Sequence, residues 1–325
     1  MRHAIIVGTG SYAPENRITN DNLAELVETS DEWIVSRTGI RERRISVGEL
    51  TSDLAYKAAK RAVEDAKISP EDIELIICAT ITPDSFMPSV ACQVQDRLGA
   101  RRAAAFDLSA ACTGIIYAAV TAAKFIESGM YSSVLVIGAE TLSKIVDWED
   151  RSTCVLFGDG AGAMVLAASD KGGGILASNL LADGSKSSLL MCPSLPLTNP
   201  YINDDVSLPL KLTMQGQDVF KFAVRTIADN INTILQKSSV STDDIKYIIP
   251  HQANIRILEQ AARYCNIPME KFYANLELYG NTSAASIGIA LDELSRSGQL
   301  YPGDKLILVG FGGGLTSGAI LVQWV

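Results

Sequence analysis

The chain has 325 residues, of which 47% are hydrophobic and 20% charged, and its formal net charge is −9. This composition is typical of a well-packed globular protein and excludes disordered, collagen-like and coiled-coil chains, while the length suggests two domains or one large one. The negative charge argues against a nucleic-acid-binding protein, although a local basic patch can still bind an acidic partner.

Short apolar runs alternate with helical patterns along the whole chain. The predicted strands are, in chain order, residues 73–80, 103–109, 133–140, 161–168, 245–251, 305–311 and 318–325. The predicted helices lie between them, at residues 52–67, 87–98, 113–128, 217–236, 253–265 and 284–297. This alternation predicts an α/β fold with layered sheets and helices.

No segment predicts a membrane span or a secretion signal. The most apolar stretch, residues 113–125, contains Lys124 and is shorter than the roughly 20 apolar residues that a transmembrane helix needs. The N-terminal apolar run meets Gly, Ser and Pro too early for a signal peptide. The six cysteines show no Cys-x-x-Cys spacing, so we expect a reduced, cytoplasmic protein with neither disulfides nor a metal site.

The two halves of the chain resemble each other. ISPEDIELIICAT at 68–80 matches VSTDDIKYIIPHQ at 240–252, and two further pairs of short motifs follow in the same order. The repeated order predicts a duplication, with an N-terminal half at about 1–170 and a C-terminal half at about 171–325, each with its own sheet.

The same comparison of halves aligns reactive side chains. An offset of 169 residues, set by a Ser-Gly pair after each helix, places Cys112 opposite Asn281, and an offset of 172 places His251 opposite Ala79 at a strand end. Ligand sites in α/β folds gather at the carboxyl ends of strands. If the halves pack face to face, Cys112, His251 and Asn281 can therefore converge.

Cys112 is the candidate nucleophile. It lies in DLSAACTGIIYAA (107–119), where a strand, a tight turn of small residues and a helix follow one another. Unpaired N–H groups at a helix start favour a thiolate, which is a good nucleophile toward a thioester. The alternative is a structural cysteine, which is how we interpret Cys78 and Cys154 in their apolar runs.

His251 and Asn281 are candidate hydrogen-bond donors. His251 directly follows a predicted strand, and Asn281 lies in a glycine-led turn where Thr282 or Ser283 is the candidate helix cap. Both side chains can donate to one carbonyl oxygen, which would stabilise an enolate beside a thioester. The alternatives are a satisfied buried histidine and a capping asparagine. The glycines at 312–314 offer bare backbone N–H groups to a ligand.

Seven motifs in order resemble those of the β-ketoacyl-[acyl-carrier-protein] synthase III family, the initiating condensing enzymes of bacterial type II fatty acid synthesis. They are GTGSYAPE, TSDEWIVSRTGIRERR, DLSAACTG, LFGDGAGA, PHQANIRI, GNTSAAS and GFGGGLTSG. The resemblance covers essentially the whole chain. It implies a thiolase fold with five αβαβα layers, a homodimer, no bound cofactor, and acyl-CoA and malonyl-acyl carrier protein as substrates.

The resemblance also implies roles for the reactive residues. Cys112, His251 and Asn281 would form a catalytic triad, and the backbone N–H groups of Cys112 and Gly313 an oxyanion hole. In the implied ping-pong reaction an acyl-CoA acylates Cys112, and malonyl-carrier protein then loses carbon dioxide and attacks the acyl group. A neutral His251 would act with Asn281 as a donor to the enolate, and the product would be a 3-ketoacyl-carrier protein.

Further residues match binding positions of the family. The CoA site would include Trp33 against the adenine, Arg37 on the phosphates, Arg151 as a further contact and Asn254 near the pantetheine. Without the resemblance, Trp33 would be interpreted as a half-buried anchor and the arginines as a solvated face.

The resemblance places a basic patch for the acidic carrier protein at Arg256 and Arg263, with Lys221 a less secure match. Met87 stands where many relatives carry Phe at the wall of the acyl pocket. Because Met is flexible, we expect acetyl or a somewhat larger or branched primer. The Pro-rich stretch 191–210 is expected at the entrance of the site.

Other functions remain open on the sequence alone. A secondary-metabolite acyltransferase or ketide synthase of the same superfamily would keep the fold and differ in its acceptor. A non-catalytic partner of an active condensing subunit would keep only the fold, and the intact Cys112, His251 and Asn281 argue against it. A dinucleotide-binding enzyme is not favoured, because Ala13 stands where the third glycine of the motif at 8–10 would be.

Overall fold

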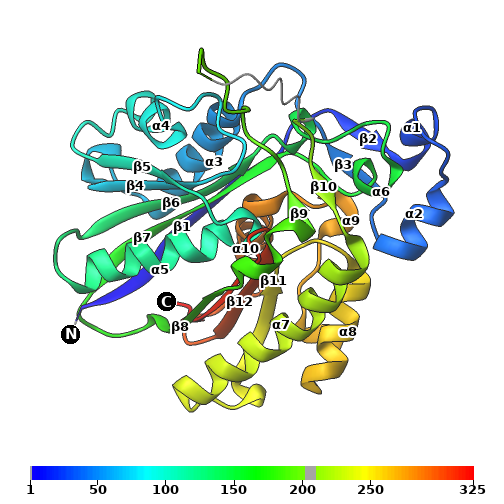
Figure 1. The fold of residues 1–325 in the computed structure, drawn as a ribbon. Helices are drawn as coiled ribbons and strands as arrows, with labels where there is room; N and C mark the ends of the chain where they lie inside the picture. Colours follow the sequence, from blue (N-terminus) through cyan, green and yellow to red (C-terminus); the bar gives the residue numbers. More distant parts are fainter. Residues whose placement is uncertain (1, 202–209) are drawn as a thin grey trace.

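The computed structural model describes residues 2–201 and 210–325. Its helices and sheets form five layers, with outer helices on both sides, two sheets inside them and two helices in the middle (Figure 1). The predicted α/β fold with αβαβα layers is therefore confirmed. No helix within these residues is long and apolar enough to cross a bilayer.

The first sheet has five strands that come from residues 3–169. Their order is β1 (His3–Tyr12), β7 (Gly160–Ser169), β6 (Ser133–Glu140), β4 (Leu75–Ala79) and β5 (Ala104–Leu108). Strand β4 is parallel to β5 and β6, whereas β7 is antiparallel to both of its neighbours. Strands β4 and β6 are buried almost throughout, as expected for strands covered on both faces.

The second sheet has four strands that come from residues 174–323. Their order is β11 (Ile245–Pro250), β12 (Lys305–Gly312), β13 (Thr316–Gln323) and β8 (Gly174–Ala182). Strands β11 and β12 are parallel, and the other pairs are antiparallel. Two short ribbons complete the strands, β2 (Arg17–Thr19) with β3 (Glu42–Arg44) and β9 (Leu190–Met191) with β10 (Thr213–Met214).

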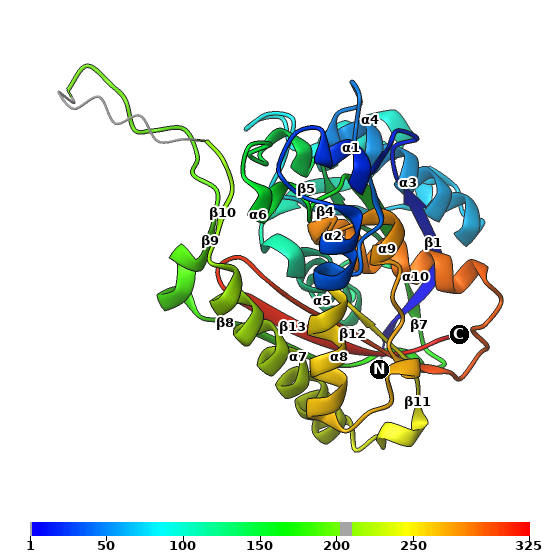
Figure 2. The same ribbon diagram turned by 90° about the vertical axis from the view of Figure 1, so that its right-hand side faces the viewer.

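Helices separate and cover the sheets (Figures 1 and 2). Helices α3 (Thr51–Ala66) and α4 (Val90–Leu98) cover the first sheet, and α7 (Gly216–Ser238) and α8 (Ile255–Cys265) cover the second. The central layer contains α5 (Gly114–Glu127) and α10 (Ser286–Arg296). Four shorter helices are α1 (Asn20–Ala24), α2 (Asp31–Thr38), α6 (Arg151–Cys154) and α9 (Leu276–Tyr279).

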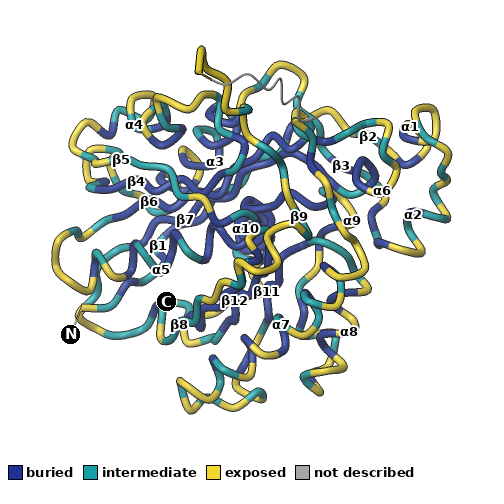
Figure 3. The backbone as a smooth tube through the Cα atoms, in the orientation of Figure 1, coloured by how far each residue is buried: buried dark blue, intermediate teal, exposed yellow. Residues whose placement is uncertain are grey.

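Three apolar clusters fill the spaces between these layers, and the sheets and central helices are the most buried parts of the chain (Figure 3). The middle cluster takes side chains from both sheets and both central helices, for example Ile77, Ile116, Ile287 and Leu308. Backbones also touch there, since a Cβ at Gly138 of β6 would lie 2.1 Å from the Ala284 carbonyl oxygen. Only glycine fits such an approach.

The central helices begin in the same way. A single 3₁₀ turn precedes each one, η2 (Ala111–Thr113) before α5 and η7 (Ser283–Ala285) before α10. Both turns open on a left-handed residue, Ala111 at φ 46° and Ser283 at φ 48°. The residue opposite Cys112 is therefore Ala284, and its predicted alignment with Asn281 is wrong. The offset of 169 arose because α5 has 14 residues and α10 only 11, which brings the following Ser-Gly pair closer.

Some element boundaries differ from the prediction. The helix predicted at 87–98 begins only at Val90, because Pro88 precedes the cap residue Ser89, whose side chain accepts from the Cys92 N–H. Met87 thus lies in a loop.

The prediction missed strands β1 and β8 and helix α2. Gly10 interrupts the apolar pattern of β1 because α3 crosses there, and a Cβ would lie 2.3 Å from the Ala58 carbonyl oxygen.

Candidate active site

A cavity of about 1420 Å³ opens where β4, β5 and β12 end. The main segments lining it are residues 80–87, 107–112, 190–195 and 313–314, together with Phe157, Leu212 and Ser283. Most of these side chains are apolar, and polar groups gather at the strand ends. An apolar cavity with a few convergent polar groups is suited to an acyl chain and its reacting carbonyl.

Cys112 lines this cavity from η2 and is 6% exposed. Two contacts fix its turn. The Thr113 hydroxyl donates to the Ala110 carbonyl at 2.7 Å. On the other side, a Cβ at Gly312 would lie 2.7 Å from the Cys112 backbone nitrogen, so only glycine lets the end of β12 come this close. The neighbouring Gly313 lines the same cavity.

The surroundings of the Cys112 thiol act on its charge in opposite directions. Burial raises its pKa to about 12, a hydrogen bond with the Ser283 side chain opposes this, and the charge of Glu140 raises it further. Burial thus opposes the thiolate that the turn and the helix start favour. The sulfur must lose its proton when it attacks.

His251 directly follows β11 and is 1% exposed. Its backbone N–H donates to Val309 at 2.8 Å, and its ring meets that of Phe311 edge-on at 5.2 Å between centroids. Its Nδ1 lies 2.7 Å from the Ser286 hydroxyl. Burial lowers the pKa of His251 to about 3, so the ring is neutral at pH 7.

The hydrogen bonds of Ser286 allow His251 to carry its ring hydrogen on Nε2. The Ser286 oxygen accepts from the Gln252 backbone N–H at 3.4 Å, so its own hydrogen is available for the imidazole Nδ1. An Nδ1 that accepts leaves the hydrogen of the ring on Nε2. His251 can therefore donate one hydrogen bond through Nε2 while remaining neutral.

Asn281 lies between α9 and η7 and is 7% exposed. Its backbone bonds to the segment that contains Phe157, with N–H to the Leu156 carbonyl at 2.8 Å and its carbonyl to the Gly158 N–H at 3.0 Å. Its side-chain Oδ1 accepts from the Ser283 N–H at 2.9 Å. Because Oδ1 is engaged, the amide presents its NH₂ group as the free donor.

The turn that contains Ser283 connects the three predicted residues. Ser283 contacts Cys112 through its side chain and Asn281 through its N–H. Ser286, three residues later, holds His251. The structure therefore brings Cys112, His251 and Asn281 to one turn at the start of α10, although His251 and Asn281 are not among the cavity-lining residues.

The roles of Ser283, in this turn, and of Glu140, which contacts it, were not predicted. Ser283 is not a helix cap, because Thr282 occupies that position without a side-chain bond and the Ser283 hydroxyl donates to Glu140 at 3.2 Å. Glu140 is fully buried at the end of β6. The signal for it was present, since a lone carboxylate ends the apolar run SVLVIGAE.

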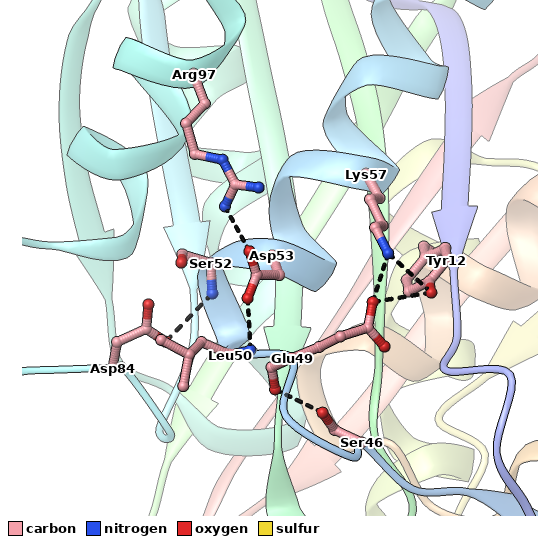
Figure 4. Close-up of polar contacts among 9 residues, drawn as sticks. All are labelled: Tyr12, Ser46, Glu49, Leu50, Ser52, Asp53, Lys57, Asp84 and Arg97. Atoms are coloured by element: carbon pink, nitrogen blue, oxygen red, sulfur yellow. Dashed lines mark hydrogen bonds and ion pairs between the residues drawn. The ribbon is translucent and has the colours of Figure 1, made fainter.

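The loop at 80–89 forms one wall of the cavity and is anchored at two points. Asp84 accepts from the Ser52 N–H at 3.2 Å, at the start of α3 (Figure 4). The Lys144 ammonium donates to the Thr82 and Pro83 carbonyls at 2.6 and 2.8 Å. Beyond these anchors, Met87 lines the cavity and is 82% exposed.

The start of α3 is itself braced by ion pairs, which keeps this anchor in place. Asp53 accepts from the Leu50 N–H at 2.7 Å and pairs with Arg97 at 2.9 Å (Figure 4). In the same view Lys57 pairs with Glu49 at 2.5 Å.

The four predicted CoA residues form one cluster. The guanidinium carbons of Arg37 and Arg151 each lie 4.8 Å from the centroid of the Trp33 ring. The Asn254 side chain donates to the Arg37 carbonyl at 3.0 Å, and Arg151 donates to the Glu28 carbonyl at 2.7 Å. The cluster joins α2, α6 and the start of α8, and it presents two cations beside an aromatic ring.

The predicted carrier-protein patch is only partly brought together. Arg256 and Arg263 are exposed and lie two turns apart, on the same face of α8. Lys221 is exposed near the start of α7 and pairs with Asp218 at 3.5 Å. Within residues 2–201 and 210–325, no hydrogen bond or ion pair links Lys221 to the arginines.

The stretch at 191–210 reaches the cavity at both ends. Residues 191–195 and Leu210 line the cavity, while residues 202–209 lie outside the described part of the chain. The segment that follows β9 extends away from the body of the molecule (Figure 2), with Leu197 78% exposed.

Comparisons with known proteins agree with this geometry. A family model described as 3-oxoacyl-[acyl-carrier-protein (ACP)] synthase III matches residues 106–184, and the model of its C-terminal part matches residues 235–324. A β-ketoacyl-[acyl-carrier-protein] synthase III from Clostridium acetobutylicum is 52% identical over 324 residues, which cover 100% of this chain and 99% of the relative.

Solved structures give the same picture. The crystal structure of 3-oxoacyl-[acyl-carrier-protein] synthase III from Aquifex aeolicus VF5 has a TM-score of 0.93 and 48% identity, covering 99% of this chain and 100% of that one. The priming β-ketosynthase of the R1128 polyketide pathway also has a TM-score of 0.93, over 99% of this chain and 96% of its own, but only 34% identity.

Proposed function

Because this chain belongs to the β-ketoacyl-[acyl-carrier-protein] synthase III family, we propose that Cys112, His251 and Asn281 carry out its decarboxylative condensation. The chain is an acyltransferase that initiates fatty acid synthesis. A role in secondary metabolism is not favoured, since the R1128 ketosynthase is less similar in sequence than the fatty acid enzymes.

In the first half-reaction the Cys112 sulfur attacks the thioester carbonyl of an acyl-CoA. The carbonyl oxygen becomes negative and is held by the backbone N–H groups of Cys112 and Gly313. The close contact of Gly312 with the Cys112 nitrogen supports this oxyanion hole, because it sets the end of β12 beside the nucleophile. CoA then leaves, and the acyl group stays on Cys112.

In the second half-reaction malonyl-carrier protein binds and loses carbon dioxide. Nε2–H of His251 and the NH₂ group of Asn281 donate to the thioester carbonyl, where the enolate charge develops. In this role the imidazole of His251 stays neutral while it donates. Burial lowers its pKa to about 3 and so keeps it neutral. The enolate carbon attacks acyl-Cys112 and gives 3-ketoacyl-carrier protein. Loss of carbon dioxide creates the carbon nucleophile without a strong base.

We assign substrate recognition to three places. Trp33, Arg37, Arg151 and Asn254 bind the nucleotide end of CoA, a role that their common cluster supports. Arg256 and Arg263, assisted by Lys221, orient the acidic carrier protein. Met87 and its loop set the primer size, and the cavity of about 1420 Å³ supports acetyl or a somewhat larger or branched acyl group.

We also propose a homodimer and a cytoplasmic location. The exposed Phe86 and Met87, at 75% and 82%, line the cavity together with Asp107 and Leu108 of the edge strand β5 and support an interface at this point. All six cysteines are free thiols, which supports a reducing compartment.

One observation carries the proposed function, namely the turn at Ser283 that contacts Cys112 and Asn281 while Ser286 holds His251. Incubation with acetyl-CoA or isobutyryl-CoA should add one acyl group, read by mass spectrometry, and Cys112→Ala should abolish the adduct. His251→Ala and Asn281→Ala should suppress malonyl decarboxylation by roughly 10² while acylation changes much less.

Equal loss of both half-reactions in the histidine and asparagine variants would count against their assigned roles. Malonyl-carrier protein and malonyl-CoA, offered side by side, test the acceptor. Preference for malonyl-CoA would favour the secondary-metabolite alternative, and the absence of any acyl adduct would favour a non-catalytic chain.

A further inference from the structure

Glu140 is a buried carboxylate that the reaction described above does not use. Its Oε2 accepts from the hydroxyls of Thr80 at 3.1 Å and Thr82 at 2.5 Å and from the Ile81 N–H at 3.2 Å. Its Oε1 accepts from the Ser283 hydroxyl at 3.2 Å. Every one of these contacts is a donor to the carboxylate, and together they favour its ionised form.

The threonine hydroxyls cannot turn away from Glu140 without losing bonds. The Thr80 oxygen accepts from the Thr82 N–H at 3.1 Å, and the Thr82 oxygen accepts from the Thr141 N–H at 2.9 Å. Their hydrogens are therefore left for Glu140. Among the described residues no cation forms an ion pair with the carboxylate, because the nearby Lys144, although it senses the charge of Glu140, donates to backbone carbonyls.

A carboxylate held by donors but lacking a counter-ion is a comparatively strong base. Burial raises the pKa of Glu140 to about 7, although the hydrogen bonds from Thr82, Ile81, Thr80 and Ser283 oppose this. Ordinary glutamate titrates near 4.3. At neutral pH Glu140 can therefore both give and accept a proton, which is the property of a general base.

Ser283 bridges Glu140 and Cys112. Its hydroxyl donates to Glu140 at 3.2 Å, and on its other side it forms the side-chain contact with Cys112 that favours the thiolate. The left-handed backbone of Ser283, at φ 48°, is unusual for a residue other than glycine and holds the hydroxyl at this position. The contacts form a continuous path from sulfur to hydroxyl to carboxylate.

We propose that Glu140 receives the Cys112 proton through the Ser283 hydroxyl during acylation and returns it to the sulfur during condensation. This inference rests on the proposed role of Cys112 as nucleophile. Glu140 is fully buried and does not line the cavity, so it acts as a proton acceptor through Ser283, and Ser283 is the positioning residue between them.

Acylation is balanced as follows. The bond between the Cys112 sulfur and the acyl carbon forms, and the bond between that carbon and the CoA sulfur breaks. The thiol proton passes to the Ser283 oxygen as the serine's own proton passes to Glu140. CoA leaves as a thiolate and takes its proton from water, so the acyl-enzyme carries a neutral Glu140.

Condensation reverses the transfer. Malonyl-carrier protein brings one negative charge, and the electron pair of its breaking carbon–carbon bond forms the enolate. The enolate carbon bonds to the acyl carbon, and Cys112 is expelled as a thiolate. Glu140 returns the stored proton through Ser283, so the charge that arrived on malonate ends on Glu140. A neutral Glu140 during this step also avoids repulsion of the enolate.

The proposal predicts a pH dependence for acylation. The titratable and charged groups that face Glu140 are Cys112 of η2, Cys78 of β4 and Lys144 of η3 (Leu142–Lys144). Burial raises the pKa of both thiols, to about 12 for Cys112, and His251 has a pKa of about 3. Among the described groups that face the sulfur, Glu140 has a pKa raised to about 7, and acylation should accelerate as it ionises.

Rapid-mixing measurement of Cys112 acylation by acetyl-CoA from pH 5 to 9 tests this, with malonyl-carrier protein decarboxylation measured on the same proteins. The full-length chain should show a rate that rises around pH 7. Glu140→Gln and Ser283→Ala should each lose roughly 10² in acylation rate at pH 8 and should lose this rise. In both variants the rate of malonyl-carrier protein decarboxylation should stay within a few-fold of that of the unaltered chain. His251 remains, and so does the backbone N–H of residue 283 that orients Asn281.

Thr282→Val is the matched control, because it removes the neighbouring buried hydroxyl, which has no hydrogen-bond partner within residues 2–201 and 210–325. It should retain the normal acylation rate and pH profile. Ser283→Ala decides the outcome if Glu140→Gln does not fold, since it leaves the bonds of Glu140 to the threonines in place. Normal acylation with an unchanged pH profile in either relay variant would overturn the proposal, whereas failure of the unaltered chain to acylate would instead overturn the proposed function.

Discussion

His251 owes its neutral state to burial, and this makes the stability of the protein depend on pH. The imidazole has a pKa near 6.5 in an unfolded chain but about 3 in the folded one. Below pH 6.5 the unfolded chain therefore binds a proton that the folded chain does not. The free energy of unfolding should fall by about 1.4 kcal/mol for each pH unit between 6.5 and 3 on account of this residue.

Urea unfolding at pH 7 and pH 5 measures this effect when the chain is compared with His251→Gln, which carries no titrating group. Between pH 7 and pH 5, the free energy of unfolding of the unaltered chain should fall by about 2 kcal/mol more than that of the variant. Glu140 and other groups titrate in both proteins and cancel in the comparison. An equal loss in the two proteins would show that His251 is not held neutral by the fold.

The sequence allowed the residues of the triad to be chosen by type and context, but not the groups that position them. Cys112, His251 and Asn281 stand at strand ends or turns and carry recognisable chemistry. Ser283 and Ser286 look like ordinary cap residues in the sequence. Their roles depend on which lone pair each hydroxyl meets across the fold, and sequence patterns do not contain that information. The depth at which Cys112 is buried, which raises the pKa of its thiol, was hidden for the same reason.

The cavity wall at 80–89 is the element where a single substitution should change the choice of primer. Its base is fixed by Ser52 and Lys144, whereas Met87 at its tip is held by neither. Met87→Phe places a stiffer, larger side chain at the cavity. We expect kcat/KM for isobutyryl-CoA to fall roughly tenfold relative to acetyl-CoA, as one methylene is typically worth 10- to 200-fold in a tight pocket.

Competition between the two acyl-CoA primers, with malonyl-carrier protein as extender, measures this ratio directly. Met130→Phe is the control, because Met130 is also exposed but lies outside the cavity lining. An unchanged ratio in Met87→Phe would mean that the loop does not limit primer size.

Elements with a clear period were predicted well, and those shaped by close packing were not. Strand β6 was predicted at its observed bounds, and α5 within one residue at each end, because both are apolar runs bounded by turn residues. Strand β1 has glycines where an alternating strand would have side chains, since α3 crosses it at backbone distance. Strand β8 is a partly exposed edge strand with a mixed pattern.

At the scale of the whole molecule, the proposed dimer is the feature most open to test. Light scattering should give a mass near twice the 34.8 kDa of one chain. Phe86→Glu should shift this mass toward that of one chain, because a charge would be buried against an apolar partner. Tyr301→Glu, at another exposed aromatic residue, should leave it unchanged. A single-chain mass for the unaltered protein would refute the dimer.

The shared middle cluster makes the two halves of the chain depend on each other. Ile77 and Ile116 belong to the first half of the sequence and Ile287 and Leu308 to the second, yet all four pack in one layer. Neither half produced alone would have a partner for that apolar face, so each would aggregate or require a second copy. We therefore expect the two halves, expressed as separate chains, to stay in solution only when they are produced together.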